Sequence, residues 1–136
     1  MSGSDRHEER NVSRKIVSFI KQHVSSVSEL EVLLLSYAES QRGWTAQTVA
    51  QELRTTTDLA KRHLNKLENH QILIYRNVDN QECFYFEPKD PDVQAVVADL
   101  AVFYNSHRLR IIDLIYAPKE DALAVFADAF RFRKDD

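Results

Sequence analysis

The sequence has few of the residues that mark covalent cross-links or irregular backbone. Among its 136 residues are one cysteine, two glycines and three prolines. Cys83 has no second thiol with which to form an intramolecular disulfide or a thiolate zinc site, which suits a reducing compartment and excludes metal-dependent folding of that kind. Scarce glycine and proline leave long stretches that favour helix. We therefore expect one mostly α-helical domain, and we predict no cofactor.

Long hydrophobic runs and enzyme signatures are missing as well. No apolar stretch approaches the ~20 residues that cross a bilayer, and no basic start followed by an apolar region marks a secretory leader. We predict a cytoplasmic protein without membrane contact. The sequence contains no glycine-rich phosphate loop, no clustered metal-ligand spacing and no G-x-S-x-G motif. We therefore expect no enzyme, with no catalytic and no metal-binding residues.

Charge is distributed unevenly. Lys and Arg number 18 against 21 Asp and Glu, which gives a net charge of −3 and argues against a chain that binds nucleic acid over its whole surface. Within residues 45–76, however, five basic residues outnumber three acidic ones. A modular reader of DNA needs only a locally basic element, and this segment is the one that qualifies.

The first part of the chain reads as a tail followed by two helices. Residues 1–11 are polar and offer nothing to bury, which predicts a disordered tail. Over residues 12–27, apolar side chains recur at steps of three and four, as on a short amphipathic helix. Ser28 and Glu31 have the spacing of a capping box, so a second helix should begin near Ser28. Its run of four apolar residues at 32–35 indicates a buried helix.

Threonines divide the next segment into two further helices. Thr45 can cap a short third helix, and residues 54–57 interrupt its pattern and begin a fourth. On a helical wheel the fourth helix has two faces. The inward face carries Leu59, Ala60, His63, Leu64 and Leu67. The outward face carries Asp58, Lys61, Arg62, Asn65, Lys66 and Asn69.

A hairpin and terminal helices complete the pattern. Residues 72–76 and 82–87 are rich in β-branched and aromatic side chains, and the turn-forming connector 77–81 between them predicts a two-stranded hairpin. Asp90-Pro91 then begins a helix whose apolar face continues past twenty residues to Ile115.

Pro118 ends that long helix and can open another. The pair, within residues 89–136, is predicted to form a helical hairpin. Its apolar face is larger than one small core requires, although it could fold back on its own domain. We expect it to join two copies of the chain in a homodimer.

The order of these elements resembles bacterial winged helix-turn-helix regulators, especially the multiple-antibiotic-resistance-regulator type. The resemblance rests on residues 45–53 (TAQTVAQEL), 55–69 (TTTDLAKRHLNKLEN) and 72–74 (ILI). It implies a mostly α (α+β) fold with a winged helix-turn-helix domain over 28–88, a two-stranded wing and C-terminal helices for dimerisation. It also implies a transcription regulator that binds double-stranded DNA, with a small-molecule effector as a further family property.

In that family the helix at about 56–70 enters the major groove. Arg62, at the centre of its outward face, suits guanine edges, Asn65 suits adenine, and Lys61 and Lys66 flank them at phosphate-reaching positions. The predicted DNA-binding residues are Thr45, Thr56, Thr57, Lys61, Arg62, Asn65, Lys66 and Arg76.

Three features differ from the family pattern. The wing turn at 78–82 lacks a basic tip, Gln71 stands where glycine is usual, and Asp58 adds a negative charge at the start of the reading helix. The basic residues of that helix could also form an ordinary solvated face. The alternative is a winged helix that serves as a protein-interaction or assembly module without DNA binding.

Overall fold

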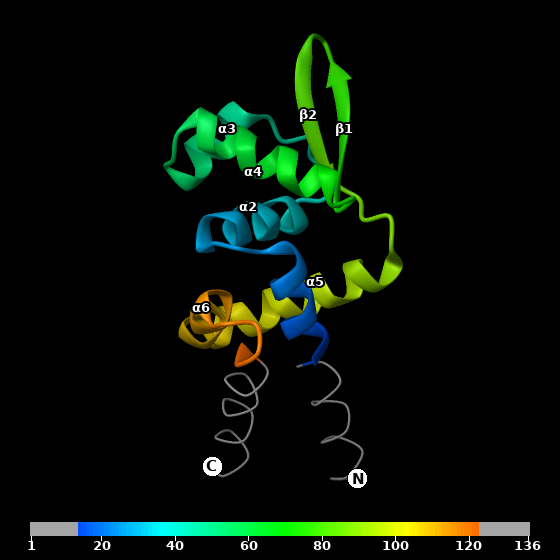
Figure 1. Cartoon of the computed structure of the whole chain (residues 1–136). Helices are drawn as coiled ribbons and strands as arrows, with labels where there is room; N and C mark the ends of the chain where they lie inside the picture. The colour runs from blue at the N-terminus through cyan, green and yellow to red at the C-terminus, as the bar shows by residue number, and fades with distance from the viewer. Residues whose placement is uncertain (1–13, 123–136) are drawn as a thin grey trace. The chain divides into compact units, whose positions relative to one another are not determined.

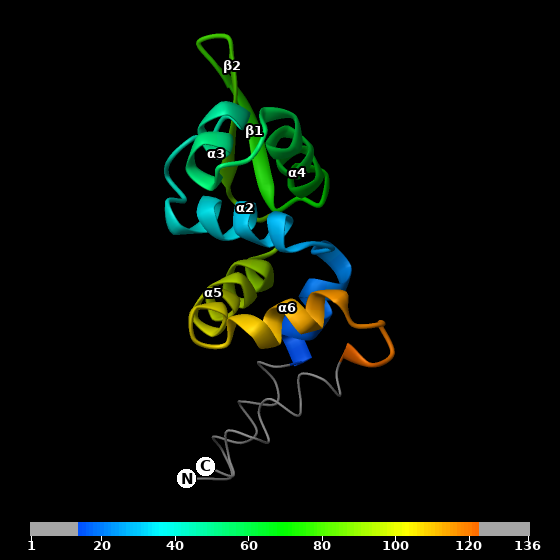
Figure 2. The same cartoon turned by 90° about the vertical axis from the view of Figure 1, so that its left-hand side faces the viewer.

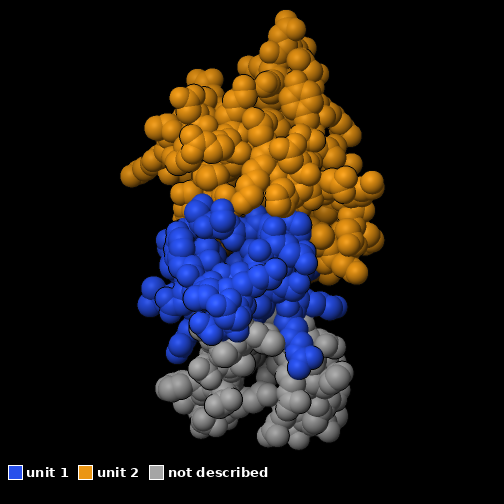
Figure 3. Space-filling view, in the orientation of Figure 1, with its two compact units in different colours: residues 1–27, 96–136 blue, residues 28–95 orange. Residues whose placement is uncertain are grey.

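The computed structural model describes residues 14–122 of the chain, which form two compact units (Figure 3). One unit runs from Ser28 to Ala95. The other combines the described residues up to Val27 with those from Val96 onward. The predicted tail at 1–11 lies outside the described residues. Within the described part, no helix has the length and apolar character needed to cross a membrane.

The unit Ser28–Ala95 contains three helices followed by a β-hairpin. In chain order the elements are α2 (Val27–Ala38), α3 (Ala46–Leu53), α4 (Thr57–Asn69), β1 (Leu73–Val78) and β2 (Gln81–Phe86) (Figure 1). Leu30 and Leu33 of α2 are fully buried, as the apolar run predicted. Because α2 begins at Val27, Ser28 lies in its first turn, so the predicted capping position was two residues too late.

The hairpin is tighter than the sequence predicted. β1 and β2 are antiparallel, with Leu73 opposite Phe86 and Val78 opposite Gln81. Only Asp79 and Asn80 connect them, with φ angles of 52° and 65°. Two consecutive positive φ angles define the type I′ turn, which matches the twist of paired strands. The predicted five-residue connector was therefore wrong, because three of its residues pair in the strands.

Trp44 joins the hairpin to the helices. Its backbone N–H and C=O exchange hydrogen bonds of 2.8 Å with Phe84, which adds a short bridge on the outer side of β2. Both side chains are buried, so Trp44 is the core residue that the sequence indicated. The neighbouring Gly43 has no room for a side chain, because an added Cβ would lie 2.6 Å from the Tyr85 hydroxyl. Beyond this anchor the hairpin projects past α3 and α4, as both Figure 1 and Figure 2 show.

The second unit contains helical residues 14–23, the part of α5 (Pro91–Ser106) from Val96 onward, and α6 (Arg108–Tyr116). Ile16 and Ile20 are fully buried, in agreement with the predicted stripe. Lys21 ties the first helix to the end of α6, since its ammonium donates hydrogen bonds to the carbonyl oxygens of Ile115, at 3.0 Å, and Ala117. These bonds satisfy carbonyls that a helix end leaves free.

The predicted single long helix is broken at His107. This residue has φ −135° and ψ 51°, outside the helical region. The Ser106 hydroxyl lies 3.4 Å from the carbonyl oxygens of Val102 and Phe103 and 2.9 Å from His107 Nδ1. Such local side-chain bonds compete with the helix backbone. The helix predicted after Pro118 falls mainly on residues 123–136, outside the described residues.

A left-handed residue ends α4. Gln71 has φ 63°, and its N–H donates to the carbonyl of Glu68 at 2.9 Å. The N–H of Ile72 donates to the carbonyl of Leu67 at 3.0 Å, and both of these side chains are fully buried. These two hydrogen bonds, together with their hydrophobic contact, form the Schellman motif, whose left-handed position favours glycine. Gln71, which stands where glycine is usual, is therefore under backbone strain.

Gln71→Gly is expected to stabilise the protein. Relief of the left-handed strain gains about 1–2 kcal/mol, and the greater freedom of glycine in the unfolded chain offsets about 0.5–1 kcal/mol of it. Urea unfolding should therefore show a net gain of up to about 1 kcal/mol. Gln51→Gly, at an exposed helical position of α3, is the matched control and should destabilise by about 1 kcal/mol. Equal losses from both substitutions would contradict the strain at Gln71.

Candidate nucleic-acid interface

Threonine caps fix the helix-turn-helix formed by α3 and α4. The Thr45 hydroxyl accepts a hydrogen bond from the Thr48 N–H at 3.1 Å, and the Thr48 hydroxyl accepts one from the Thr45 N–H at 2.9 Å. The Thr56 hydroxyl accepts from the Leu59 N–H at 3.1 Å and so begins α4. The predicted site residues Thr45 and Thr56 therefore have a structural role as helix caps. Thr57 is exposed in the first turn of α4.

The two faces of α4 are separated as the helical wheel predicted. Ala60, Leu64 and Leu67 have no exposed surface, and His63 is 7% exposed. The opposite face is open to solvent. Its exposed residues are Asp58, Lys61, Arg62, Asn65 and Asn69. The structure therefore brings Arg62 and Asn65 together on one accessible helix face, which is where a groove-reading helix needs them.

Lys66 is placed differently from the other predicted DNA-binding residues of α4. Its ammonium is 2.7 Å and 2.9 Å from the two carboxylate oxygens of Glu29 on α2. Glu29 is only 6% exposed, whereas the Lys66 side chain is 32% exposed, so the carboxylate of this ion pair is buried and the lysine is partly solvated. The pair holds α4 against α2. The positive charge of Lys66, which the sequence assigned to phosphate contact, is therefore engaged by Glu29.

Lys61 connects the helix face with the hairpin, and Arg76 lies on the hairpin itself. Lys61 Nζ lies 3.6 Å from the Glu82 carboxylate of β2, with both side chains about half exposed. Such surface pairs contribute little, so Lys61 can exchange this partner for a phosphate. Arg76 is exposed on β1, with its guanidinium carbon 5.4 Å from the centre of the Tyr85 ring. The nearby tip of the hairpin carries the acidic Asp79.

One further candidate was not among the predicted contacts. Arg54 is exposed between α3 and α4 and has a left-handed φ of 55°. Its N–H donates to the carbonyl of Ala50, which closes α3 and places a basic side chain at the turn. The signal available in the sequence was a basic residue directly before the threonine cluster.

His63 is the buried titratable group of α4. Burial lowers the pKa of His63; the carboxylate of Glu29 raises it, and the charges of Arg62 and Lys66 lower it. Its Nε2 atom has no hydrogen-bond partner. His63 is therefore neutral at neutral pH and acts as a core residue, as expected from its place on the inward face. Among the described residues, no group of three His, Cys, Asp or Glu side chains is arranged to hold a metal ion.

Comparison with solved structures identifies the fold. No protein-family model and no curated protein matches the sequence. MepR, a transcription regulator of the multidrug efflux pump MepA in Staphylococcus aureus, superposes in its DNA complex with a TM-score of 0.54. The match covers 99% of this chain and 95% of MepR at 14% identity. The fold is a winged helix-turn-helix.

A second winged helix-turn-helix neighbour is the homodimeric DNA-binding domain of a Mycobacterium bovis protein. It superposes with a TM-score of 0.52 at 16% identity, covering 68% of this chain and 81% of the fragment. In both comparisons the identity is low, so what is shared is the fold. Within the winged helix-turn-helix, α4 takes the place of the second helix and β1–β2 that of the wing.

Replacing His63 should change how stability depends on pH. Because the pKa of His63 is lower in the folded protein, the unfolded chain binds the proton more readily. Stability is therefore lost as pH falls from about 6.5 through the folded pKa. His63→Leu removes that loss, so its free energy of unfolding should rise relative to wild type between about pH 8 and pH 5. At about pH 8 the two proteins differ by packing alone, and parallel curves below that pH would disprove the titration of His63.

Proposed function

We propose that this protein is a homodimeric, sequence-specific DNA-binding transcription regulator that reads the major groove with α4. The observation that carries the proposal is the exposed pair Arg62 and Asn65 on a helix whose opposite face is buried. A reading helix needs such a rigid mount and a free polar face. The solved DNA complex of MepR, which has the same fold, supports this use of the unit.

Each side chain has a chemical role in the proposal. Arg62 donates two hydrogen bonds to the O6 and N7 atoms of guanine, and Asn65 pairs with the N6 and N7 atoms of adenine. Lys61, Arg54 and Arg76 contact phosphates along the flanks. Thr57, together with the caps Thr45 and Thr56, lies at the helix N-termini, where backbone N–H groups favour phosphate. Lys66 keeps a positioning role through Glu29.

The charge of the unit limits non-specific affinity. Residues 28–95 contain seven Lys and Arg against eleven Asp and Glu. An acidic unit gains little from the phosphate backbone, so binding depends on the few cations of the α4 face and weakens only moderately with salt. The same acidity favours the second candidate function, a winged helix that binds another protein instead of DNA.

Dimerisation is proposed to use α5 and α6. Val102 and Leu109 are 73% and 75% exposed, although both are large and apolar, and Tyr116 is also exposed. Apolar side chains gathered on terminal helices mark an interaction surface. A two-fold contact between copies would cover them and present two α4 helices to successive major grooves, about one helical turn apart.

DNA binding should depend on the outward face of α4. Fluorescence anisotropy with a pool of random duplexes, followed by a selected site, is expected to show binding that weakens between about 50 and about 200 mM salt. Arg62→Ala with Asn65→Ala should lower affinity for the selected site by at least about tenfold. Arg110→Ala, which removes an exposed cation of α6, is the charge control and should change affinity by less than about twofold.

Two results would count against that proposal. No binding to any duplex at low salt by a folded dimer would favour the protein-interaction module. Equal losses of affinity in the α4 variant and the Arg110 control would show that DNA binds through positive charge in general and not through the face of α4.

The dimer should dissociate when its apolar surface is charged. Val102→Glu with Leu109→Glu introduces two carboxylates at exposed positions, which the folded monomer tolerates and a dry interface does not. Sedimentation velocity is expected to show a dimer for wild type and for Gln51→Glu on α3, and a monomer for the double variant. A double variant that remains dimeric would place the interface elsewhere.

A further inference from the structure

The proposed function leaves one surface of the winged helix unit unused, the open edge of β1. β1 pairs with β2, and Trp44 bridges to the opposite side of β2. Among the described residues no strand pairs with the other side of β1. The wing is therefore a sheet with one free edge, next to the last turn of α4.

The register shows which backbone groups that edge presents. Glu87 donates its N–H to the carbonyl of Ile72 at 3.2 Å, which marks a hydrogen-bonded position of the ladder. Bonded and non-bonded positions alternate along an antiparallel pair. Leu73, Tyr75 and Asn77 therefore direct their N–H and C=O groups away from β2, while the residues between them bond to it. Leu73 is only 1% exposed, so the groups open to a partner are those of Tyr75 and Asn77.

This edge lacks the features that usually protect a free strand. Edge strands are commonly short, interrupted by proline, bent by a bulge or lined with charge. β1 has six residues, pairs without a bulge and contains no proline, and its one charged residue is Arg76. Tyr75 and Val78 are 45% and 41% exposed. An edge of this kind is a template for an added strand.

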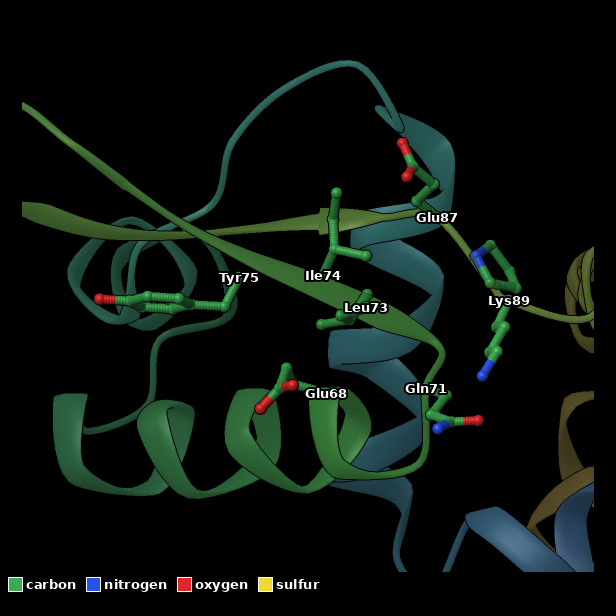
Figure 4. Close-up of a pocket in the computed structure, with 8 residues that line it drawn as sticks. Glu68, Gln71, Leu73, Ile74, Tyr75, Glu87 and Lys89 are labelled. Atoms are coloured by element: carbon green, nitrogen blue, oxygen red, sulfur yellow. The ribbon is translucent and has the colours of Figure 1, made fainter.

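A cavity of about 500 Å³ lies along the base of the edge (Figure 4). It is lined by Glu68, Gln71, Leu73, Ile74, Tyr75, Glu87, Pro88 and Lys89. In Figure 4, Ile74 and Glu87 point to one side of the β1 ribbon, while Tyr75 and Glu68 of α4 lie on the other. The alternating side chains of an added strand would therefore meet a carboxylate on each side.

We propose that the β1 edge binds an extended, basic peptide segment of a partner protein by strand addition. The N–H and C=O groups of Tyr75 and Asn77 supply the backbone bonds. Glu68 and Glu87 receive basic side chains on opposite faces, and the Tyr75 ring covers the aliphatic stem of the one that meets Glu68. Lys89, at the Gln71 end of the cavity, excludes a cation there and sets the position of the peptide.

Charge decides between this partner and other occupants. The unit has seven basic against eleven acidic residues, and none of Glu68, Glu87 and Lys89 has an ion pair among the described contacts. A cationic segment is attracted to such a surface, whereas the two carboxylates repel DNA phosphates. This inference does not depend on whether α4 binds DNA.

The test is a titration of the full ¹⁵N-labelled chain with the peptide acetyl-Val-Lys-Lys-Val-Lys-Lys-Val-amide, whose adjacent lysines lie on opposite faces of an extended strand. The amide signals of Tyr75 and Asn77 should shift, and those of Ile74 and Arg76, which already bond to β2, should shift less. The same peptide with alternate amides methylated should not bind, because it cannot donate to the edge. A peptide with glutamate in place of lysine should not bind either.

Charge variants provide the second arm. Glu68→Lys with Glu87→Lys should weaken binding of the peptide about tenfold. Glu39→Lys with Glu52→Lys, which makes the same change in net charge at exposed positions elsewhere, should weaken it less than about twofold. Equal weakening by both variants, or shifts scattered over the unit, would overturn the proposal. Shifts of the two edge amides by duplex DNA and not by the peptide would also overturn it.

Discussion

The ion pair between Glu29 and Lys66 is the contact on which the arrangement of the winged helix unit depends. A carboxylate that is 6% exposed is costly to bury unless a cation meets it, and loss of one partner from a buried pair costs about 3–5 kcal/mol in general. The pairing of Lys66 with α2 and the buried stripe of Ala60, Leu64 and Leu67 favour the same rotation of α4 about its axis. That rotation buries His63 and Leu64 and turns Arg62 outward. The orientation of the proposed DNA-reading face is thus set partly by a contact within the unit.

Backbone strain at the junctions of the unit is a second constraint. The described chain has four non-glycine residues with positive φ: Arg54, Gln71, Asp79 and Asn80. Each lies where one element ends and the next begins, and the glycines take none of these positions. The directions of α4 and the hairpin are therefore fixed by left-handed turns that other contacts must stabilise. The Schellman bonds at Ile72 and the paired strands supply that stabilisation.

Local signals in the sequence predicted the helix-turn-helix and missed what depends on distant partners. Both α3 and α4 have a threonine cap and a clear apolar stripe, so their limits and faces were readable. The break at His107 was hidden because the apolar periodicity continues from α5 into α6. The partner of Lys66 lies 37 residues earlier in the chain, and no periodic pattern marks such a pair. The two-residue turn was obscured because Asn77 and Gln81 favour turns yet pair in strands.

The two proposed surfaces meet on α4, which has a consequence for regulation. Glu68 follows Asn65 by three residues and therefore lies about one turn further along the same side of the helix. Its carboxylate opposes the approach of phosphate at the end of the reading face. A lysine of a peptide bound at the β1 edge would neutralise that charge, so the peptide and DNA should favour each other's binding. Thermodynamic linkage makes the effect reciprocal, which turns the acidity of this unit from an obstacle into a means of control by a basic partner.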